Sequence, residues 1–157
     1  MEAEAKPFVE YLGLELDEGF FPKETPFVSY HGKHSGKDIT VVTNGKDSVY
    51  GTGVDNVGTV PAAMVSFLGL THHERKFDLL INAGTCGGFK SMGAEIGDVF
   101  LTTAVANHDR RIAIPGFTEY GVGHLVNDVI DVEHMARTTG YKSGICTTGN
   151  SLDKTEK

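Results

Sequence analysis

The chain has 157 residues, of which 39% are hydrophobic, 22% are charged and 20 are glycine. This length suits one globular domain, and the apolar content excludes wholesale disorder. The formal charge of −7, from 21 acidic and 14 basic residues, argues against nucleic-acid binding, which needs clustered cations. No apolar run is long enough to suggest a membrane span.

The cysteines give a further hint about the compartment. Cys86 and Cys146 lie far apart in sequence and set neither a disulfide framework nor a zinc-binding pattern. The first residues also show no secretory signal pattern. We therefore expect a cytoplasmic protein with no metal site.

The first half of the chain predicts two helices and a hairpin. Acidic residues in the first turn favour a helix over residues 2–14. Residues 27–31 and 39–43 are rich in β-branched and aromatic residues, and a turn signal lies between them, which is typical of a hairpin. A mainly apolar run over residues 59–70, with Pro61 in its first turn, predicts a buried helix.

The second half predicts strands that alternate with a helix. Residues 77–82 and 97–103 read as buried strands, 125–137 as a helix, and 141–147 as another strand. This alternation indicates an α/β fold. No repeat or linker interrupts it, so residues 1–157 are predicted to form a single domain.

The densest candidate site is I-N-A-G-T-C-G-G-F-K at residues 81–90, directly after a predicted strand. Its three glycines and Thr85 can bring several backbone N–H groups close to a small anionic or polyhydroxy ligand. Ligands bind at the carboxyl ends of strands in open α/β sheets. A plain turn is the alternative. The spacing fits neither a P-loop nor a dinucleotide fingerprint.

Two weaker candidates stand beside it. The glycine cluster at residues 51–58, which contains Asp55, precedes the predicted helix and could approach a polar ligand. The neighbours His108 and Asp109 suggest acid–base chemistry, although a structural network is the more common role of such a pair. By position alone, Glu2 and Glu4 merely complement a helix dipole.

Taken together, seven segments in order resemble the methylthioadenosine/S-adenosylhomocysteine nucleosidases of the nucleoside phosphorylase superfamily, closest to the plant type. The matching segments are M-E-A-E-A from Met1, V-G-T-V-P-A from Val57, I-N-A-G-T-C-G-G-F-K from Ile81, G-D-V-F-L from Gly97, H-D-R-R-I from His108, Y-G-V-G from Tyr120 and T-G-N-S-L-D from Thr148. They span nearly the whole chain. The resemblance implies a phosphorylase-like three-layer α/β sandwich with a central mixed sheet, and a homodimer.

The resemblance also implies a reaction. The family hydrolyses the N-glycosidic bond of 5′-methylthioadenosine in methionine salvage, releasing adenine without any cofactor. Glu4 matches the glutamate that orients and activates the attacking water, a role that needs a carboxylate acceptor. Thr85 matches the hydroxyl residue beside the water and ribose, and the backbone of Cys86 and Gly87 is expected to line the nucleoside.

Four further residues take their expected roles from the resemblance. Leu152 matches the residue that packs on the adenine face, and Asp153 is expected to offer main-chain contacts to the base edge. Ile112 and Pro115 fall where the partner subunit of a homodimer would close the methylthio pocket.

The chain also departs from the family pattern. The resemblance places a first strand before Met1, and a ribose-gripping Met-Glu pair and the acid that protonates adenine beyond Lys157, so we expect a fold incomplete at both ends. Asn150 stands where the family has Asp. Loss of a general acid typically lowers a rate by a factor of about 10²–10⁴, so at most residual activity is expected of this chain alone.

Two other functions stay open. A non-catalytic nucleoside-binding module that pairs with a complete subunit would keep Ile112 and Pro115. A purine nucleoside phosphorylase is less favoured, because neither glycine-bearing loop carries an arginine for phosphate.

Overall fold

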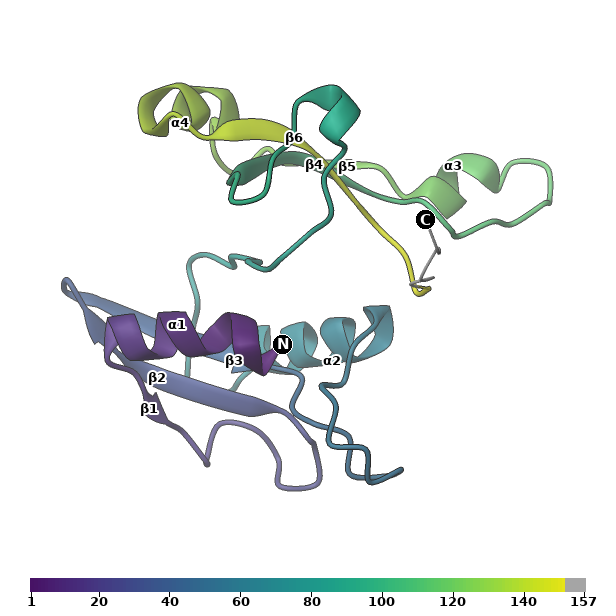
Figure 1. Cartoon of the computed structure of the whole chain (residues 1–157). Helices are drawn as coiled ribbons and strands as arrows, with labels where there is room; N and C mark the ends of the chain where they lie inside the picture. The colour runs from purple at the N-terminus through teal and green to yellow at the C-terminus, as the bar shows by residue number, and fades with distance from the viewer. Residues whose placement is uncertain (152–157) are drawn as a thin grey trace. The chain divides into compact units, whose positions relative to one another are not determined.

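The computed structural model describes residues 1–151, which form two compact units, one of Met1–Cys86 and one that begins at Gly87. Each contains a three-stranded sheet and helices (Figure 1). The predicted α/β class is confirmed. The assignment of one domain to residues 1–157 stays a prediction.

The first sheet is built on the predicted hairpin, which is confirmed. Strand β2 (Val28–His34) pairs antiparallel with β3 (Lys37–Thr43), and the short β1 (Glu15–Leu16) pairs with β2. Ser35 and Gly36 both adopt positive φ, at 48° and 74°, in the two-residue turn. Two left-handed residues in succession match the twist of the flanking strands, so this turn fixes the register of the hairpin.

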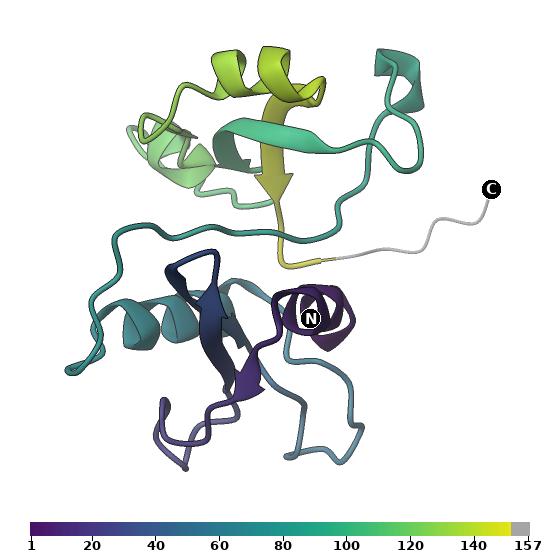
Figure 2. The ribbon, with the colours of Figure 1, turned by 90° about the vertical axis from the view of Figure 1, so that its left-hand side faces the viewer.

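Helix α1 (Glu2–Leu12) runs along the same sheet and confirms the predicted N-terminal helix. It ends at Gly13, whose left-handed backbone (φ 65°, ψ 39°) closes the last turn. Figure 2 shows α1 and α2 (Thr59–Leu70) on opposite sides of the β2–β3 hairpin. The bounds of α2 are those predicted from its sequence.

The core of the first unit lies between α2 and the sheet. Phe20, Phe21 and Val65 are buried there, and the aromatic rings of the two phenylalanines meet edge to face at 4.7 Å. Side chains from β3, α2 and the flanking loops complete the cluster: Phe27, Val42, Leu68 and Phe77. This aromatic cluster is the main apolar contact that holds α2 in place.

The second unit has a mixed sheet in the order β5–β4–β6. Strand β4 (Phe100–Asn107) pairs antiparallel with β5 (Leu125–Val126) and parallel with β6 (Lys142–Thr148). Helix α4 (Val132–Thr139) packs on β4 and β6, and the Asp131 side chain caps it by accepting the His134 N–H at 2.9 Å. The 3₁₀ turn η1 (Lys90–Met92) and the short helix α3 (Thr118–Val122) complete the unit.

One predicted strand is absent. Residues 77–82 are irregular, and Leu79, Leu80 and Ile81 are 54%, 56% and 73% exposed. An apolar run becomes a parallel strand only where neighbouring strands accept its hydrogen bonds. Within residues 1–151 no strand pairs with this run, so the strand prediction is wrong here.

Other element boundaries moved for local reasons. The strand predicted over 97–103 begins only at Phe100, because Gly97 (φ 95°) lies in a turn that the Asp98 carboxylate stabilises by accepting the Glu95 N–H at 2.7 Å. The helix predicted over 125–137 begins only at Val132, and its predicted first half is wrong, because Leu125–Val126 form β5 and residues 127–131 are irregular. The strand predicted over 141–147 is confirmed as β6. None of the helices described is long and apolar enough to cross a membrane.

Replacing Gly45 with alanine should destabilise the first unit by at least about 3 kcal/mol, because an added Cβ would lie 1.7 Å from the Pro26 carbonyl oxygen and φ is 67°. Gly36→Ala is the matched control, since its φ is 74° but nothing lies within 4 Å of the added Cβ, and should cost about 1 kcal/mol. Urea titration followed on β2 and β3 amide signals measures both. Equal effects would show that the close approach at Gly45 does not matter.

Candidate active site

The centre of the candidate site is the Glu4 carboxylate, in the first turn of α1. Its Oε1 accepts two hydrogen bonds from Thr85, one from the backbone N–H and one from the side-chain hydroxyl, both at 2.6 Å. Its Oε2 accepts from the Met1 ammonium group at 2.8 Å. The structure thus brings together the two residues for which the resemblance implies roles at the attacking water.

The approach of Thr85 to Glu4 depends on the residue before it. Gly84 lies so close to the carboxylate that an added Cβ would stand 3.3 Å from Glu4 Oε1. Thr85 itself lies on an exposed irregular segment, and its hydrogen bonds to Glu4 hold it in place. The glycine-rich sequence thus brings the Thr85 backbone N–H to a carboxylate of the chain itself, while its approach to a ligand stays a prediction.

The electrostatics of this contact keep Glu4 ionised. The hydrogen bond from the Met1 ammonium, then the Thr85 hydroxyl and the Thr85 N–H, lower the pKa of Glu4 from 4.5 to about 2. All three favour the charged form, and they outweigh the desolvation of a side chain that is only 20% exposed. A carboxylate this acidic can accept a hydrogen bond from water and orient it, but it is a weak proton acceptor at neutral pH.

The other predicted site residues fall in three places. Cys86 is exposed and follows Thr85 directly, and Gly87 begins the second unit. Ile112 is half-buried and Pro115 exposed, both on the loop before α3 of the second unit. Leu152 and Asp153 lie outside the described residues. Their predicted roles are untested by the geometry.

The His108–Asp109 pair belongs to a network at the ends of β4 and β6. His108 Nδ1 lies 3.2 Å from the Thr147 hydroxyl, and the Asp109 carboxylate accepts the Asn150 N–H at 2.7 Å. Between them, Gly149 has no room for a side chain, because an added Cβ would stand 2.6 Å from atoms of both His108 and Asp109. The pair therefore fixes the turn that follows β6, in keeping with the structural alternative.

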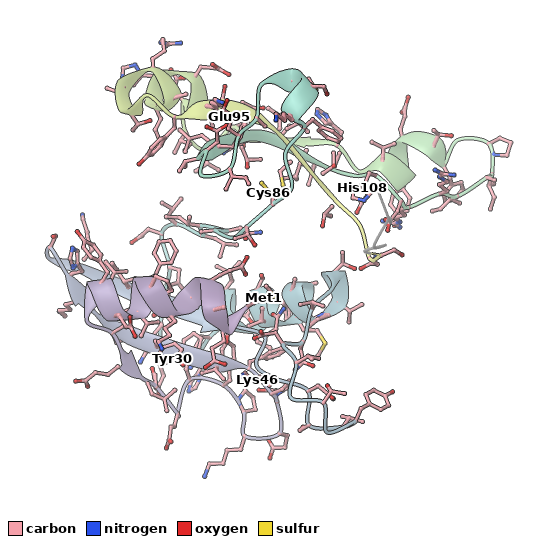
Figure 3. All side chains as sticks on the ribbon, viewed as in Figure 1. Met1, Tyr30, Lys46, Cys86, Glu95 and His108 are labelled. Carbon is pink, nitrogen blue, oxygen red and sulfur yellow. The ribbon has the colours of Figure 1, made fainter. Side chains whose placement is uncertain are left out.

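Sequence reasoning missed the contacts around the start of α1. The Asp55 carboxylate accepts the Glu2 N–H at 2.9 Å, and Lys46 Nζ lies 2.6 Å from the Glu2 carboxylate. Figure 3 shows Met1 and Lys46 in this region of the first unit. The position of Asp55 inside a glycine-rich loop was the only sequence signal for these contacts. Among residues 1–151, no group of three or more His, Cys, Asp or Glu side chains could hold a metal ion.

Replacing Thr85 with valine should raise the pKa of Glu4 from about 2 toward 4.5, because the hydroxyl donor is lost while the backbone donor stays. Thr85→Ser keeps both donors and should leave the pKa low. The amide signal of residue 85, followed against pH, reports the titration in all three proteins. Identical titrations of the serine and valine variants would contradict a role for the hydroxyl.

The same pKa predicts how stability depends on pH. A group whose pKa is lowered on folding stabilises the protein above its unfolded value of about 4.5, and this contribution is lost as the pH falls through about 2. Wild type should therefore lose more stability than Glu4→Gln between these two pH values. Urea midpoints measured across that range test the difference, and parallel curves would contradict it.

Comparison with known proteins places this chain in a family. A family model described as the phosphorylase superfamily matches residues 1–141. The chain is 46% identical over 154 residues to a 5′-methylthioadenosine nucleosidase of Arabidopsis thaliana, covering 98% of this chain and 55% of that protein. A 5′-methylthioadenosine/S-adenosylhomocysteine nucleosidase of the same plant is 39% identical over 154 residues, with 98% and 58% covered.

Two solved structures are also similar to this chain. The apo structure of the Arabidopsis thaliana 5′-methylthioadenosine nucleosidase superposes with a TM-score of 0.88 at 44% identity, covering 99% of this chain and 62% of that one. An MTA/SAH nucleosidase structure gives 0.89 at 38% identity, with the same coverage. This chain thus spans little more than half the length of the curated relatives. It belongs to the phosphorylase superfamily and has the fold of the solved methylthioadenosine nucleosidases.

Proposed function

We propose that this chain carries the water-orienting half of a 5′-methylthioadenosine nucleosidase, an N-ribosyl hydrolase of methionine salvage that releases adenine. The observation that carries the proposal is the Glu4 carboxylate, held ionised by both donors of Thr85. The proposal is supported by membership of the phosphorylase superfamily and by the activity that the names of the two plant relatives state.

The chemistry asks for a carboxylate at this point. Water adds to the anomeric carbon of the ribose as the bond to adenine breaks, and the bonding electrons leave with the base. Positive charge builds on the sugar in such a reaction, so a fixed anion beside the water stabilises it. Glu4 accepts a hydrogen bond from the water, while Thr85 holds Oε1.

The proton balance involves both ends of the reaction. The water gives up one proton, and the departing adenine must gain one. Glu4 becomes a better acceptor for the first proton when substrate excludes solvent, because desolvation raises its pKa. By the family resemblance, the second proton comes from an aspartate outside these 157 residues.

The remaining site residues enter as part of the same proposal. By the family resemblance, the backbone of Cys86 and Gly87 lines the nucleoside, Leu152 packs on the adenine face and Asp153 offers main-chain contacts to the base edge. The functional unit is a homodimer in which Ile112 and Pro115 close the methylthio pocket of the partner. The reaction needs no cofactor. We also propose a cytoplasmic location, which the free thiols of Cys86 and Cys146 support.

Adenine release from 5′-methylthioadenosine tests the function. We expect slow, phosphate-independent release that Glu4→Gln lowers by at least about 10²-fold, with nucleoside binding retained. Glu10→Gln is the matched control, because Glu10 lies on the same helix, is exposed and pairs only loosely with Lys6, at 3.7 Å. It should leave the rate unchanged.

Calorimetric titration with the nucleoside separates the other outcomes. Binding without turnover in wild type would contradict hydrolysis by this chain and favour the nucleoside-binding module. Acceleration by phosphate would favour a phosphorylase. Turnover at ordinary enzymatic rates would overturn the expectation that the acid lies outside this chain, and absence of binding would count against the nucleosidase proposal as a whole.

A further inference from the structure

The 44–56 loop, which joins β3 to the region before α2, is a closed and well-braced structure. Lys46 and Asp55 face each other in an antiparallel β-bridge. Asn44 and Asn56 bond reciprocally, each side-chain amide donating to the backbone carbonyl of the other, at 2.8 and 3.2 Å. The two ends of the loop, which form its stem, are therefore held together by hydrogen bonds.

The tip of the same loop is fixed by Asp47. Its carboxylate accepts the backbone N–H groups of Val49, Tyr50 and Thr52 and the Thr52 hydroxyl, at distances from 2.6 to 3.1 Å. These donors, the Thr52 hydroxyl foremost, lower the pKa of Asp47 to about 2. With stem and tip both held, the loop can act as a firm support for whatever its side chains touch.

Two of its side chains touch the first residue of α1. Asp55 Oδ1 accepts the Glu2 N–H at 2.9 Å, and Lys46 Nζ pairs with Glu2 Oε2 at 2.6 Å. The first N–H groups of a helix have no partner within the helix, and its N-terminus favours negative charge. Asp55 meets both needs from a distant part of the chain, and Lys46 holds Glu2 beside it.

The same turn of α1 carries Glu4, two residues further on. Its hydrogen bonds to Thr85 depend on the helix beginning at the right place and at the right angle, because a first turn without caps frays. We propose that Asp55 and Lys46 are positioning residues, which clamp the first turn of α1 and so hold the Glu4 carboxylate against Thr85. That this placement serves hydrolysis rests on the proposed function.

The two members of the clamp contribute unequally. The Lys46–Glu2 pair is exposed, with both side chains more than half accessible, and exposed ion pairs contribute little. Asp55 is half-buried and bonds a backbone donor that has no partner within the helix. Asp55→Ala should therefore disturb Glu4 more than Lys46→Met, and Asp55→Asn, which keeps an acceptor oxygen, should fall between them.

The pKa of Glu4, read from the Thr85 amide signal against pH, tests the clamp on the full chain. Asp55→Ala should raise it from about 2 toward 4.5, because the Thr85 donors move away. The sign is diagnostic: removing the negative charge of Asp55 without moving Glu4 would lower the pKa instead. An unchanged or lowered value, with the β2 and β3 amide signals intact, would overturn the proposal.

A second readout avoids acid. At neutral pH, hydrogen exchange at the Thr85 amide should accelerate about three- to tenfold in Asp55→Ala, the range expected for a lost helix cap. Asp38→Ala is the control, because it removes another carboxylate of the first unit that lies in the hairpin and pairs with Lys33 at 3.7 Å. Should Asp55→Ala fail to fold, Asp55→Asn and Lys46→Met carry the same test, and equal exchange in these two and wild type would overturn the clamp.

Neither readout requires turnover, so the clamp and the proposed function fail separately. Absence of nucleoside binding, with the expected change at Thr85, would contradict the nucleosidase and leave the clamp standing. Where adenine release is measurable, Asp55→Ala should lower kcat more than it raises KM, because a displaced carboxylate affects the reacting water more than nucleoside binding.

Discussion

The hydrogen bonds from Thr85 to Glu4 connect the start of the first unit with its end. They join residues 81 positions apart, and a single carboxylate oxygen receives both donors. The nearby carboxylate leaves little room for a side chain at Gly84. The first turn of α1 is also bound to the 44–56 loop through Asp55. A carboxylate that accepts hydrogen bonds from three donors cannot move without leaving several of them unpaired. The surrounding contacts therefore hold it in one position.

The chemical character of Glu4 follows from the same contact. Its low pKa suits a group that orients water and stabilises positive charge. In the hydrolysis that we propose, the sugar develops positive charge beside this carboxylate, which stabilises that charge.

The sequence predicted those parts of the fold that local signals determine. The hairpin has its turn residues and β-branched strands, and α2 has proline in its first turn and an apolar run of the right length. Residues 77–82 carried the signal of a buried strand but lack a pairing strand among the described residues, and pairing is a tertiary property. Glu4 was identified by family resemblance alone, because on one sequence a carboxylate in a first turn is explained by the helix dipole. The contact of Asp55 with the Glu2 N–H could not be predicted, because the two residues lie 53 positions apart.

The run Leu79–Leu80–Ile81 has a consequence for handling the molecule. It combines β-forming, apolar side chains with exposure, and its backbone pairs with no strand of the part that the structure describes. Such a segment is a template for strands from other molecules, and the driving force grows with protein concentration. Solutions of this chain should therefore become turbid or form oligomers when concentrated or warmed, and a lysine in place of Leu80 would act as a gatekeeper that keeps them dispersed.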